Sequence, residues 1–264
     1  MVKDQKLGVS QNMLDKKNNL ESPPIKLTIV VPVFNEVENV GPLIDEIRTA
    51  LENNISYEMV FVDDCSDDGT FDKLILLNSE VDNLRVLSHR CRSGQSAAIR
   101  SGVKSARGVL VATLDGDGQN NPSDIPDLLA AYEDNIINTN NVMICGQRAN
   151  RKDSFVRRLS SKIANKIRSS LLGDFAQDSG CGLKLFRAKD FIDLPSFDHM
   201  HRFLPALMIR DGGKVISVHV SHRPRKRGKS KYGILDRLWV GIFDLFGMVW
   251  LKYRPINPEV NESE

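Results

Sequence analysis

The fold is decided by residues 27–64, which read LTIVVPVFNEVENVGPLIDEIRTALENNISYEMVFVDD. Two short apolar runs, 27–34 and 57–64, flank a segment whose apolar residues recur at helical spacing through Ile44 and Leu51. A strand, a helix and a second strand in this order are typical of a parallel sheet covered by helices. Pro42 is expected in the first turn of the helix, where its missing N–H costs nothing.

The same alternation continues along the chain. A helix is predicted from Thr70 to about Asn78, a strand over 84–87, a helix over 94–106 and a strand over VLVATLD, 109–115. We therefore predict an α/β fold with a mostly parallel central sheet flanked by helices. A length of 264 residues suits one large domain, which we place at 25–235. The polar residues 1–24 are predicted to be a disordered leader, and 236–264 an apolar amphipathic segment and tail.

Composition excludes several classes of protein. The chain is 41% hydrophobic and 27% charged with a net charge of +2, which argues against disordered, collagen-like and coiled-coil proteins and does not favour a nucleic-acid partner. Four cysteines, at 65, 91, 145 and 181, form no CxxC pair, so reduced thiols in a cytoplasmic protein are expected rather than zinc or disulfides. Apolar runs fall short of the roughly 18 residues of a spanning helix, and we expect no integral membrane segment.

The tetrad DGDG follows the predicted strand 109–115 directly. Ligands of parallel α/β sheets bind beyond the carboxyl ends of the strands, so this is a favoured position for a site. Asp115, Asp117 and Gln119 offer hard oxygen ligands to Mg²⁺ or Mn²⁺, and the glycines at 116 and 118 would let the main chain approach a phosphate. The alternative is an Asp-Gly turn that only caps neighbouring amides.

A second acidic turn, VDDCSDDGT at 62–70, also follows a predicted strand. It would place Asp63 and Asp64 on the same rim of the sheet, where they could accept hydrogen bonds from the base or ribose of a nucleotide. The alternative is a helix cap in which Ser66 and Asp67 satisfy free N–H groups.

The first strand ends in VPVFNE, where Pro32 stiffens the exit, Phe34 could pack against a base and Glu36 could accept from it. In this order and spacing, VPVFNExENV, VDDxSxDGT and DGDGQNxP resemble the family 2 glycosyltransferases of GT-A fold. The motifs GQR, RRLSSKIAN, QDSGCGLKLFR and RxRGKSKYG extend the resemblance to the polyprenyl-phosphate (dolichol-phosphate) mannosyltransferase group, over about four fifths of the chain.

This resemblance implies a metal-dependent, inverting transfer of a hexose to a polyprenyl or dolichyl phosphate at the cytoplasmic face of a membrane. Mannose from GDP-mannose is the commonest pairing in the group. A UDP-sugar donor, a saccharide acceptor and a non-catalytic nucleotide-sugar-binding protein are the alternatives. A small membrane protein as a further partner is left open.

The resemblance also implies roles for individual residues. Nucleotide contacts are implied at Pro32, Phe34, Glu36, Val62 and Asp64, with Phe34 standing where the family usually has Tyr. The donor diphosphate and metal motif is matched by Asp115, Gly116, Asp117 and Gln119, of which Asp117 and Gln119 would ligate the metal. Arg148 matches the arginine near the reacting phosphates, Arg157 and Ser161 the acceptor-phosphate site, and Arg202, Arg225 and Lys231 further donor contacts.

The basic residues agree with this chemistry, because arginine forks hold phosphate in bidentate fashion and a lysine acts as a point charge. We expect Asp115, Asp117 and Arg148 to be catalytic. No general base is nominated, since a phosphate acceptor is already an anion and catalysis would rest on positioning and on stabilising the leaving diphosphate.

The last apolar segment carries aromatic residues at helical spacing, at 239, 243, 246 and 250, with Arg237 and Lys252 on its flanks. This pattern predicts an interfacial helix that lies on a bilayer and keeps the protein peripheral. A helix packed on the core or against a membrane partner is the alternative.

Overall fold

The structure is a computed structural model that describes residues 24–52, 55–136, 141–148, 168–173, 178–224 and 234–254, with the side chains of 234–240 left out. The predicted leader therefore lies almost wholly outside the described residues. Within the described part, seven strands form one sheet in the order β3-β2-β1-β4-β6-β5-β7. The strands are β1 (Leu27–Val33), β2 (Tyr57–Asp63), β3 (Leu84–Ser88), β4 (Leu110–Thr113), β5 (Val142–Arg148), β6 (Lys184–Arg187) and β7 (Lys214–Val220).

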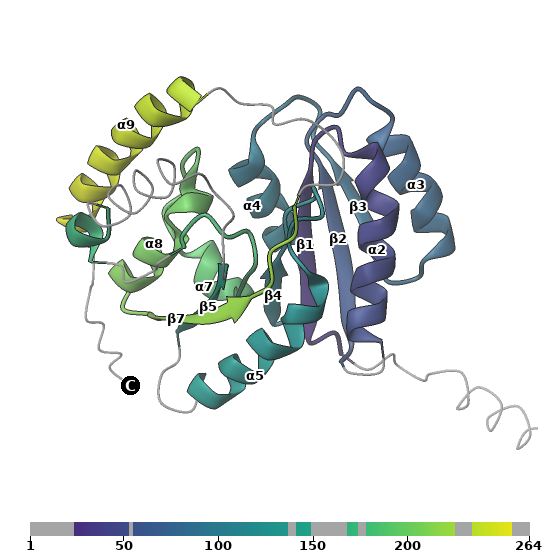
Figure 1. Cartoon of the computed structure of the whole chain (residues 1–264), viewed down its shortest axis with the longest axis horizontal. Coiled ribbons are helices and arrows are strands. Elements are labelled where there is room, and N and C mark those ends of the chain that lie inside the picture. Colours follow the sequence, from purple (N-terminus) through teal and green to yellow (C-terminus); the bar gives the residue numbers. More distant parts are fainter. Residues whose placement is uncertain are drawn as a thin grey trace, which may run out of the picture.

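From β1 to β5 the α-helices alternate with the strands along the chain (Figure 1). They are α2 (Val37–Leu51), α3 (Thr70–Glu80), α4 (Gln95–Ser105), α5 (Ile125–Ile136), α7 (Ala188–Ile192), α8 (Leu204–Arg210) and α9 (Ile234–Lys252). Two short 3₁₀ helices, η2 (Pro122–Asp124) and η3 (Met200–Arg202), precede α5 and α8. The predicted α/β alternation is confirmed, and apart from the start of the first helix the predicted helix and strand ends up to β4 differ from the observed ones by one or two residues.

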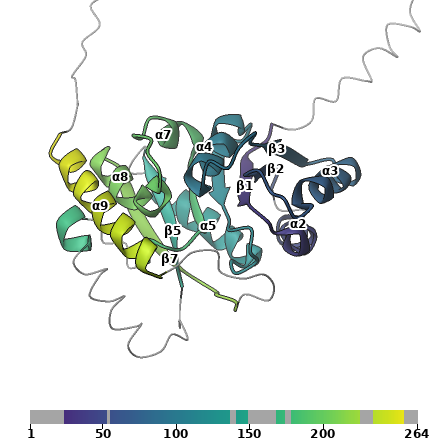
Figure 2. The same ribbon diagram turned by 90° about the horizontal axis from the view of Figure 1, so that it is seen from above.

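Helices cover both faces of the sheet, as the view from above shows (Figure 2). Helices α2, α3 and α5 pack on one face, over a core that includes Ile29 and Val31 of β1. Helices α4, α7 and α8 pack on the other face, over a core that includes Val30 of β1. Because both faces of β1 are buried, the strand reads as a continuous apolar run, which is the pattern of a central strand in a parallel sheet.

Strand β6 departs from the parallel arrangement, because it runs antiparallel to both of its neighbours, β4 and β5. Its first residue, Lys184, pairs with Thr113, the last residue of β4. The start of β6 therefore lies at the edge where the parallel strands end, and the segment 178–183 before it reaches that edge. The remaining pairs are parallel, so the prediction of a mostly parallel sheet is confirmed.

The placement of Pro42 in a first helical turn is wrong. Helix α2 begins at Val37 and contains Pro42 in its interior. The helix starts earlier because the turn after β2 satisfies its first free N–H groups: Val37 N–H donates to Asp68 Oδ2 at 3.2 Å and Glu36 N–H to Thr70 Oγ1 at 2.8 Å. These contacts join the first and second sequence motifs into one unit.

Helix α9 has a buried and an exposed face. Met248 is 2% exposed in the second core, while Phe243, Phe246 and Trp250 are 83%, 72% and 63% exposed. The guanidinium of Arg210 fixes the C-terminal end of the helix by donating to the carbonyls of Leu251 at 2.9 Å and Arg254 at 3.0 Å. Of the described helices, none combines the length and apolar character that crossing a bilayer requires.

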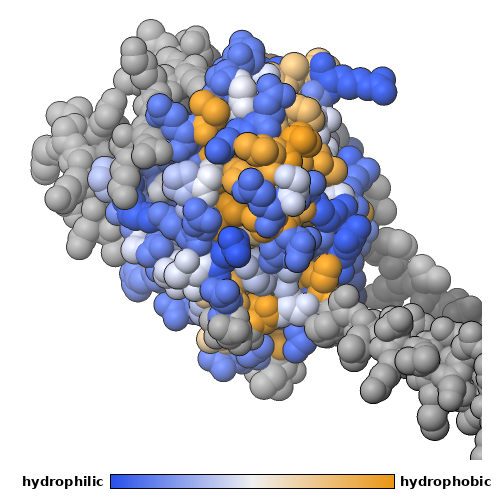
Figure 3. Space-filling view, turned by 90° about the vertical axis from the view of Figure 1, so that its right-hand side faces the viewer, coloured by the Kyte–Doolittle hydropathy of each residue, from blue (hydrophilic) through white to orange (hydrophobic). Residues whose placement is uncertain are grey.

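A second apolar surface lies on the side of α3, where apolar side chains gather among polar ones (Figure 3). Ile75 and Leu76 of this helix are 47% and 54% exposed. The molecule thus carries exposed apolar residues on two distant helices, α3 and α9.

Candidate active site

A cleft of about 300 Å³ opens beyond the carboxyl ends of β1, β2 and β4. It brings together most of the site residues predicted from the sequence. The predicted residues that line it are Pro32, Phe34, Glu36, Asp64, Asp115, Gly116, Asp117 and Arg202. The position agrees with the rule that open α/β sheets bind ligands at the carboxyl ends of their strands.

Other predicted residues do not line the cleft. Val62 is fully buried beneath α4, so its side chain does not reach a ligand there. The Gln119 amide donates to the carbonyl of Arg223 at 3.5 Å, away from the cleft. Predictions for Arg157, Ser161, Arg225 and Lys231 lie outside the described residues and stay predictions.

Asp115 lies at the base of the cleft, where protein surrounds its carboxylate. The Gln95 amide donates to Asp115 Oδ1 at 2.9 Å, and the main-chain N–H of Asp115 donates to Asn120 Oδ1 at 3.0 Å. Burial and the neighbouring Asp117 carboxylate raise the pKa of Asp115 to about 6, although Lys184 and Arg148 act in the opposite direction. Two carboxylates whose charges disfavour each other form a site suited to a cation.

Glycines let the chain close around this carboxylate. A Cβ atom on Gly182 would lie 2.2 to 2.5 Å from the carboxyl atoms of Asp115, so the carboxylate packs directly against the glycine. A Cβ on Gly116 would lie 2.6 Å from the Val33 side chain and 2.9 Å from the Pro32 carbonyl. Gly116 is therefore required for packing against β1, and its role in the approach to a phosphate stays a prediction. Gly118 has open space and a positive φ of 72°, which favours glycine.

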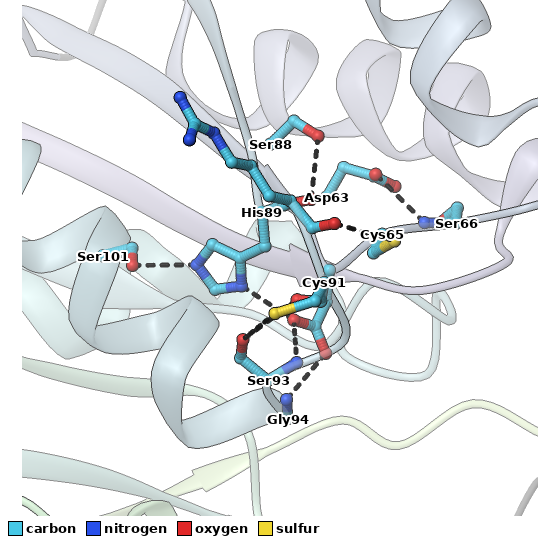
Figure 4. A network of polar contacts seen from close by, with 11 residues as sticks. Asp63, Cys65, Ser66, Ser88, His89, Cys91, Ser93, Gly94 and Ser101 are labelled. Carbon is cyan, nitrogen blue, oxygen red and sulfur yellow. Dashed lines mark hydrogen bonds and ion pairs between the residues drawn. The ribbon is translucent and has the colours of Figure 1, made fainter.

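Figure 4 shows a polar network that includes His89, Ser93, Gly94 and Ser101. Three of the contacts in this network are made to the carboxylate of Asp64. Asp64 Oδ1 accepts from His89 Nδ1 at 2.7 Å and from the N–H of Ser93 at 2.8 Å, while Oδ2 accepts from the N–H of Gly94 at 2.8 Å. On its other side His89 Nε2 contacts Ser101 Oγ at 2.9 Å. Asp64 thus ties the loop that follows β3 to the end of β2.

The rest of the second acidic turn holds the first motif in place. The N–H of Asn35 donates to Ser66 Oγ at 2.9 Å, and the Asn35 amide donates to Asp67 Oδ1 at 2.7 Å. Asp63 accepts from the N–H of Ser66 at 3.1 Å and does not line the cleft. The two hypotheses for this turn therefore divide between its residues: Asp64 faces the cleft, and Ser66 and Asp67 have a structural role.

Several cleft residues were missed in the sequence. The guanidinium carbon of Arg92 lies 4.2 Å from the centre of the Phe34 ring, and Lys184 lies buried near Asp115. His201 Nδ1 contacts Ser96 Oγ at 2.7 Å, and burial together with Lys184 and Arg202 lowers the pKa of His201 to about 3, so it is neutral near pH 7. The run RSGQS at 92–96, which ends in the first two residues of α4, was the available signal for Arg92 and Gln95.

Arg148 lies at the end of β5 behind the cleft. Its Nε and Nη2 donate to the two carboxylate oxygens of Asp178 at 2.6 and 2.7 Å. These bonds, with the charge of Asp178, raise the pKa of Arg148 and keep it a cation. Asp178 belongs to the turn 178–180, of which Ser179 and Gly180 line the cleft, so the ion pair holds that wall in place.

A second ion pair holds the loop after β4. Arg223 donates through Nη1 and Nη2 to Glu46 of α2 at 3.0 and 2.6 Å, and through Nη2 to the carbonyl of Asn120 at 2.8 Å. The N–H of Arg223 also donates to the carbonyl of Gln119 at 3.1 Å. Residues 119 and 120, beside the acidic tetrad, are thereby fixed to helix α2.

Residues 28–194 match the family model described as glycosyl transferase family 2. The chain belongs to this family. The predicted family and GT-A fold are confirmed. The matched region contains the three motifs on which the prediction depended, VPVFNExENV, VDDxSxDGT and DGDGQNxP.

Curated relatives are similar over most of the chain. It is 36% identical over 239 residues to dodecaprenyl-phosphate galacturonate synthase of Rhizobium johnstonii, covering 87% of this chain and 68% of the relative. It is 33% identical over 223 residues to undecaprenyl-phosphate 4-deoxy-4-formamido-L-arabinose transferase of Aeromonas hydrophila, covering 82% of this chain and 66% of the relative. The chain thus spans about two thirds of the length of these relatives.

Solved structures support the fold. Glucosyl-3-phosphoglycerate synthase from Mycobacterium tuberculosis, in complex with phosphoglyceric acid, has a TM-score of 0.63 at 17% identity, covering 86% of this chain and 80% of that chain. The same enzyme in complex with Mn²⁺, UDP and glucosyl-3-phosphoglycerate has a TM-score of 0.63 at 14% identity, and the match covers 96% of this chain and 86% of that chain.

Proposed function

We propose that this protein transfers a sugar from a nucleotide diphosphate sugar to a polyprenyl phosphate. The observation that carries the proposal is the pairing of Asp115 and Asp117 in one cleft with the cations Arg92, Lys184 and Arg202. A diphosphate donor needs both, since carboxylates hold a divalent cation while fixed positive charge binds phosphate oxygens. The names of the two curated relatives, both polyprenyl-phosphate sugar enzymes, support the acceptor class.

Mg²⁺ or Mn²⁺ fits the acidic pair on the chemistry of its donor atoms. Asp117 and Asp115 supply hard oxygen ligands, and the pKa of Asp115 is raised by burial and by the neighbouring Asp117 carboxylate, a repulsion that a bound cation would relieve. No cluster of three or more His, Cys, Asp or Glu side chains of metal-binding arrangement occurs in the described ranges. A cation held by few carboxylates and by substrate phosphates is the usual arrangement for Mg²⁺. When bound, the metal would stabilise charge on the departing diphosphate.

The protein residues would act by positioning. Asp117 would hold the metal and Arg202 the donor diphosphate, while Arg148, held by Asp178, would add positive charge near Asp115. Phe34 would present its ring to the base. An oxygen of the acceptor phosphate would form the new bond to the anomeric carbon as the bond to the diphosphate breaks on the opposite face, with inversion. The predicted acceptor residues Arg157 and Ser161 belong to this proposal.

The proposal also concerns the identity of the donor nucleotide sugar. GDP-mannose, expected from the group resemblance, remains one donor to test. The relatives are named for galacturonate and formamido-arabinose, which favours a UDP-linked uronic acid or amino sugar as the second. Lys184 and Arg202 in the cleft supply positive charge that would suit a sugar carboxylate.

The test is transfer from a panel of radiolabelled donors, including GDP-mannose, UDP-glucose and UDP-galacturonate, to a short polyprenyl phosphate in detergent. Parallel reactions contain Mn²⁺, Mg²⁺ or EDTA. A lipid-linked product that requires metal and is lost in Asp117→Ala supports the proposal and names the donor. Asp72→Ala, which changes a carboxylate on exposed α3, is the matched control and should retain transfer. Transfer to a saccharide, with none to lipid phosphate, would refute the proposed acceptor.

We further propose that the protein is peripheral on the cytoplasmic face of a membrane and that the exposed face of α9 contacts the bilayer. The face carries Phe243, Phe246 and Trp250, and Tyr253 follows at 73% exposed. Large aromatic side chains on one side of a helix, with basic residues such as Arg254 at its end, suit the interface between lipid head groups and acyl chains. The opposite face is already occupied by core contacts, so both sequence hypotheses for this segment are compatible with one helix.

Flotation with anionic vesicles tests this contact. Replacing Phe243, Phe246 and Trp250 together by alanine should release the protein from vesicles, because apolar burial drives interfacial binding. Ile75→Ala/Leu76→Ala on α3 is the matched control, since it removes exposed apolar surface from a distant face. Equal loss in both variants would contradict a specific α9 contact.

A further inference from the structure

The acceptor capacity of Asp64 is almost used up within the protein. A carboxylate has about four lone-pair positions, and three of them receive His89 Nδ1 and the N–H groups of Ser93 and Gly94. Two of these donors share Oδ1, while Oδ2 has one donor among the described residues. The side chain of Asp64 is 6% exposed and lines the cleft. One acceptor position on Oδ2 is therefore left for a ligand.

The His89 ring lies between Ser101 and the carboxylate of Asp64, and the contact with Ser101 can be followed in Figure 4. A carboxylate only accepts, so Nδ1 of His89 carries the proton that it donates to Asp64. On the other side of the ring, Nε2 contacts the hydroxyl of Ser101 at 2.9 Å, which prevents the ring from turning. The order Asp, His, Ser is that of a hydrolytic triad, but Ser101 lies inside α4 and does not line the cleft, so its hydroxyl orients the ring.

The same bonds position the loop that follows β3. Ser93 and Gly94 are held by the Asp64 carboxylate, and they stand between Arg92, which covers the Phe34 ring, and Gln95, which donates to Asp115. His89 is joined to the end of β2 by its own N–H, which donates to the Asp63 carbonyl at 2.8 Å. One histidine thus fixes the orientation of Asp64 and, through it, a wall of the cleft.

We propose that His89 is a positioning residue for nucleotide binding, because it orients Asp64 so that the remaining acceptor on Oδ2 receives an N–H or hydroxyl donor of the nucleoside. This inference rests on the proposed function and assigns the nucleoside end of the donor to Asp64. The ring N–H of uracil and the N–H groups of guanine are both donors, so the role applies to either base.

Calorimetry with UDP and GDP in the presence of Mn²⁺ tests the inference without turnover. His89→Ala should weaken binding of the nucleotide that wild type prefers by about tenfold, since the buried Asp64 charge loses one partner. His89→Asn places an amide nitrogen where Nδ1 stands and should restore binding to within about threefold. His89→Gln places its amide nearer the Nε2 position and should not restore it. In transfer assays the loss should appear in donor KM more than in kcat.

Ser88→Ala is the matched control, because within the described ranges its exposed hydroxyl has one hydrogen bond, to the His89 carbonyl at 3.5 Å. It should bind nucleotide like wild type. Unchanged binding in His89→Ala would overturn the inference. The inference would also be overturned if His89→Asn and His89→Gln lost nucleotide affinity equally and in proportion to their fall in melting temperature. That pattern would indicate that His89 has only a structural role. Wild type that binds neither nucleotide would overturn the proposed function itself, which distinguishes that failure from a failure of the role of His89.

Discussion

The contact between Gly182 and Asp115 makes a sharp prediction for Gly182→Ala. The added Cβ would stand 2.2 Å from Asp115 Oδ2, whereas ordinary contact begins at 3.4 Å. The carboxylate or the turn must therefore shift by about 1 Å to regain an ordinary van der Waals distance. Overpacking of this kind costs about 1 to 3 kcal/mol, equivalent to a fall in melting temperature of about 3 to 10 °C for a chain of this size. A shift of about 1 Å at a reacting centre can lower the rate of transfer about a hundredfold.

Gly180→Ala is the matched control, two residues earlier in the same segment, 178–183. Its Cβ would meet Arg148 Nη2 at 3.4 Å and Asp178 Oδ1 at 3.8 Å, which are ordinary contacts. Differential scanning fluorimetry and the transfer assay should therefore separate the two variants. In an Asp115→Ala background the stability loss from Gly182→Ala should shrink, because the atoms it meets are gone. The reasoning is refuted if Gly182→Ala and Gly180→Ala have the same melting temperature and transfer rate.

Two further predictions concern charge. In a double-mutant cycle measured by urea unfolding, Arg223→Ala and Glu46→Ala should show a coupling free energy of about 1 kcal/mol, because the ion pair is bidentate. The control pair is Arg48 and Asp45, whose side chains are exposed and whose Nη1 and Oδ1 atoms lie 4.0 Å apart, and it should show almost no coupling. Equal coupling in both pairs would contradict this prediction. For Asp115, a folded pKa of about 6 against 3.8 unfolded means that the carboxyl favours the fold when protonated, and that this stability is lost as pH rises through about 6. Metal-free wild type should therefore lose melting temperature relative to Asp115→Asn between about pH 4 and pH 7, and Mn²⁺ should restore it at pH 7; parallel curves without metal would disprove the shift.

The parts of the fold that could be predicted are those with local signals. The alternation over 27–64 identifies β1, α2 and β2 because each element is built from neighbouring residues. The insertion of β6 could not be found in this way, since Thr113 pairs with Lys184 across a long separation in sequence. The interior position of Pro42 was missed for a similar reason, because contacts from the turn after β2 extend the helix in front of it.

The site shows the same division. Asp115 and Asp117 were predictable because they directly follow a strand end, where parallel sheets bind ligands. Arg92 was not, because its role comes from stacking on Phe34, which belongs to a different loop. The ion-pair partner of Arg148 was also missed. Asp178 belongs to the motif QDSGCGLKLFR, but the neighbouring sequence does not indicate that its carboxylate contacts Arg148 at the end of β5.

The insertion of β6 has a consequence for synthesis on the ribosome. Strands β1 to β4 emerge first and can assemble in parallel, yet the outer edge of β4 stays without a partner until residues 184–187 have been made. An unpaired strand edge is a template for association with other chains, so the nascent protein is most exposed to aggregation during this interval. Gly182 packs against Asp115 when β6 pairs with β4. Pairing of the β4 edge and completion of the cleft are therefore one event. Slowing translation between β5 and β6 should therefore lower the yield of active protein more than the same delay after β7.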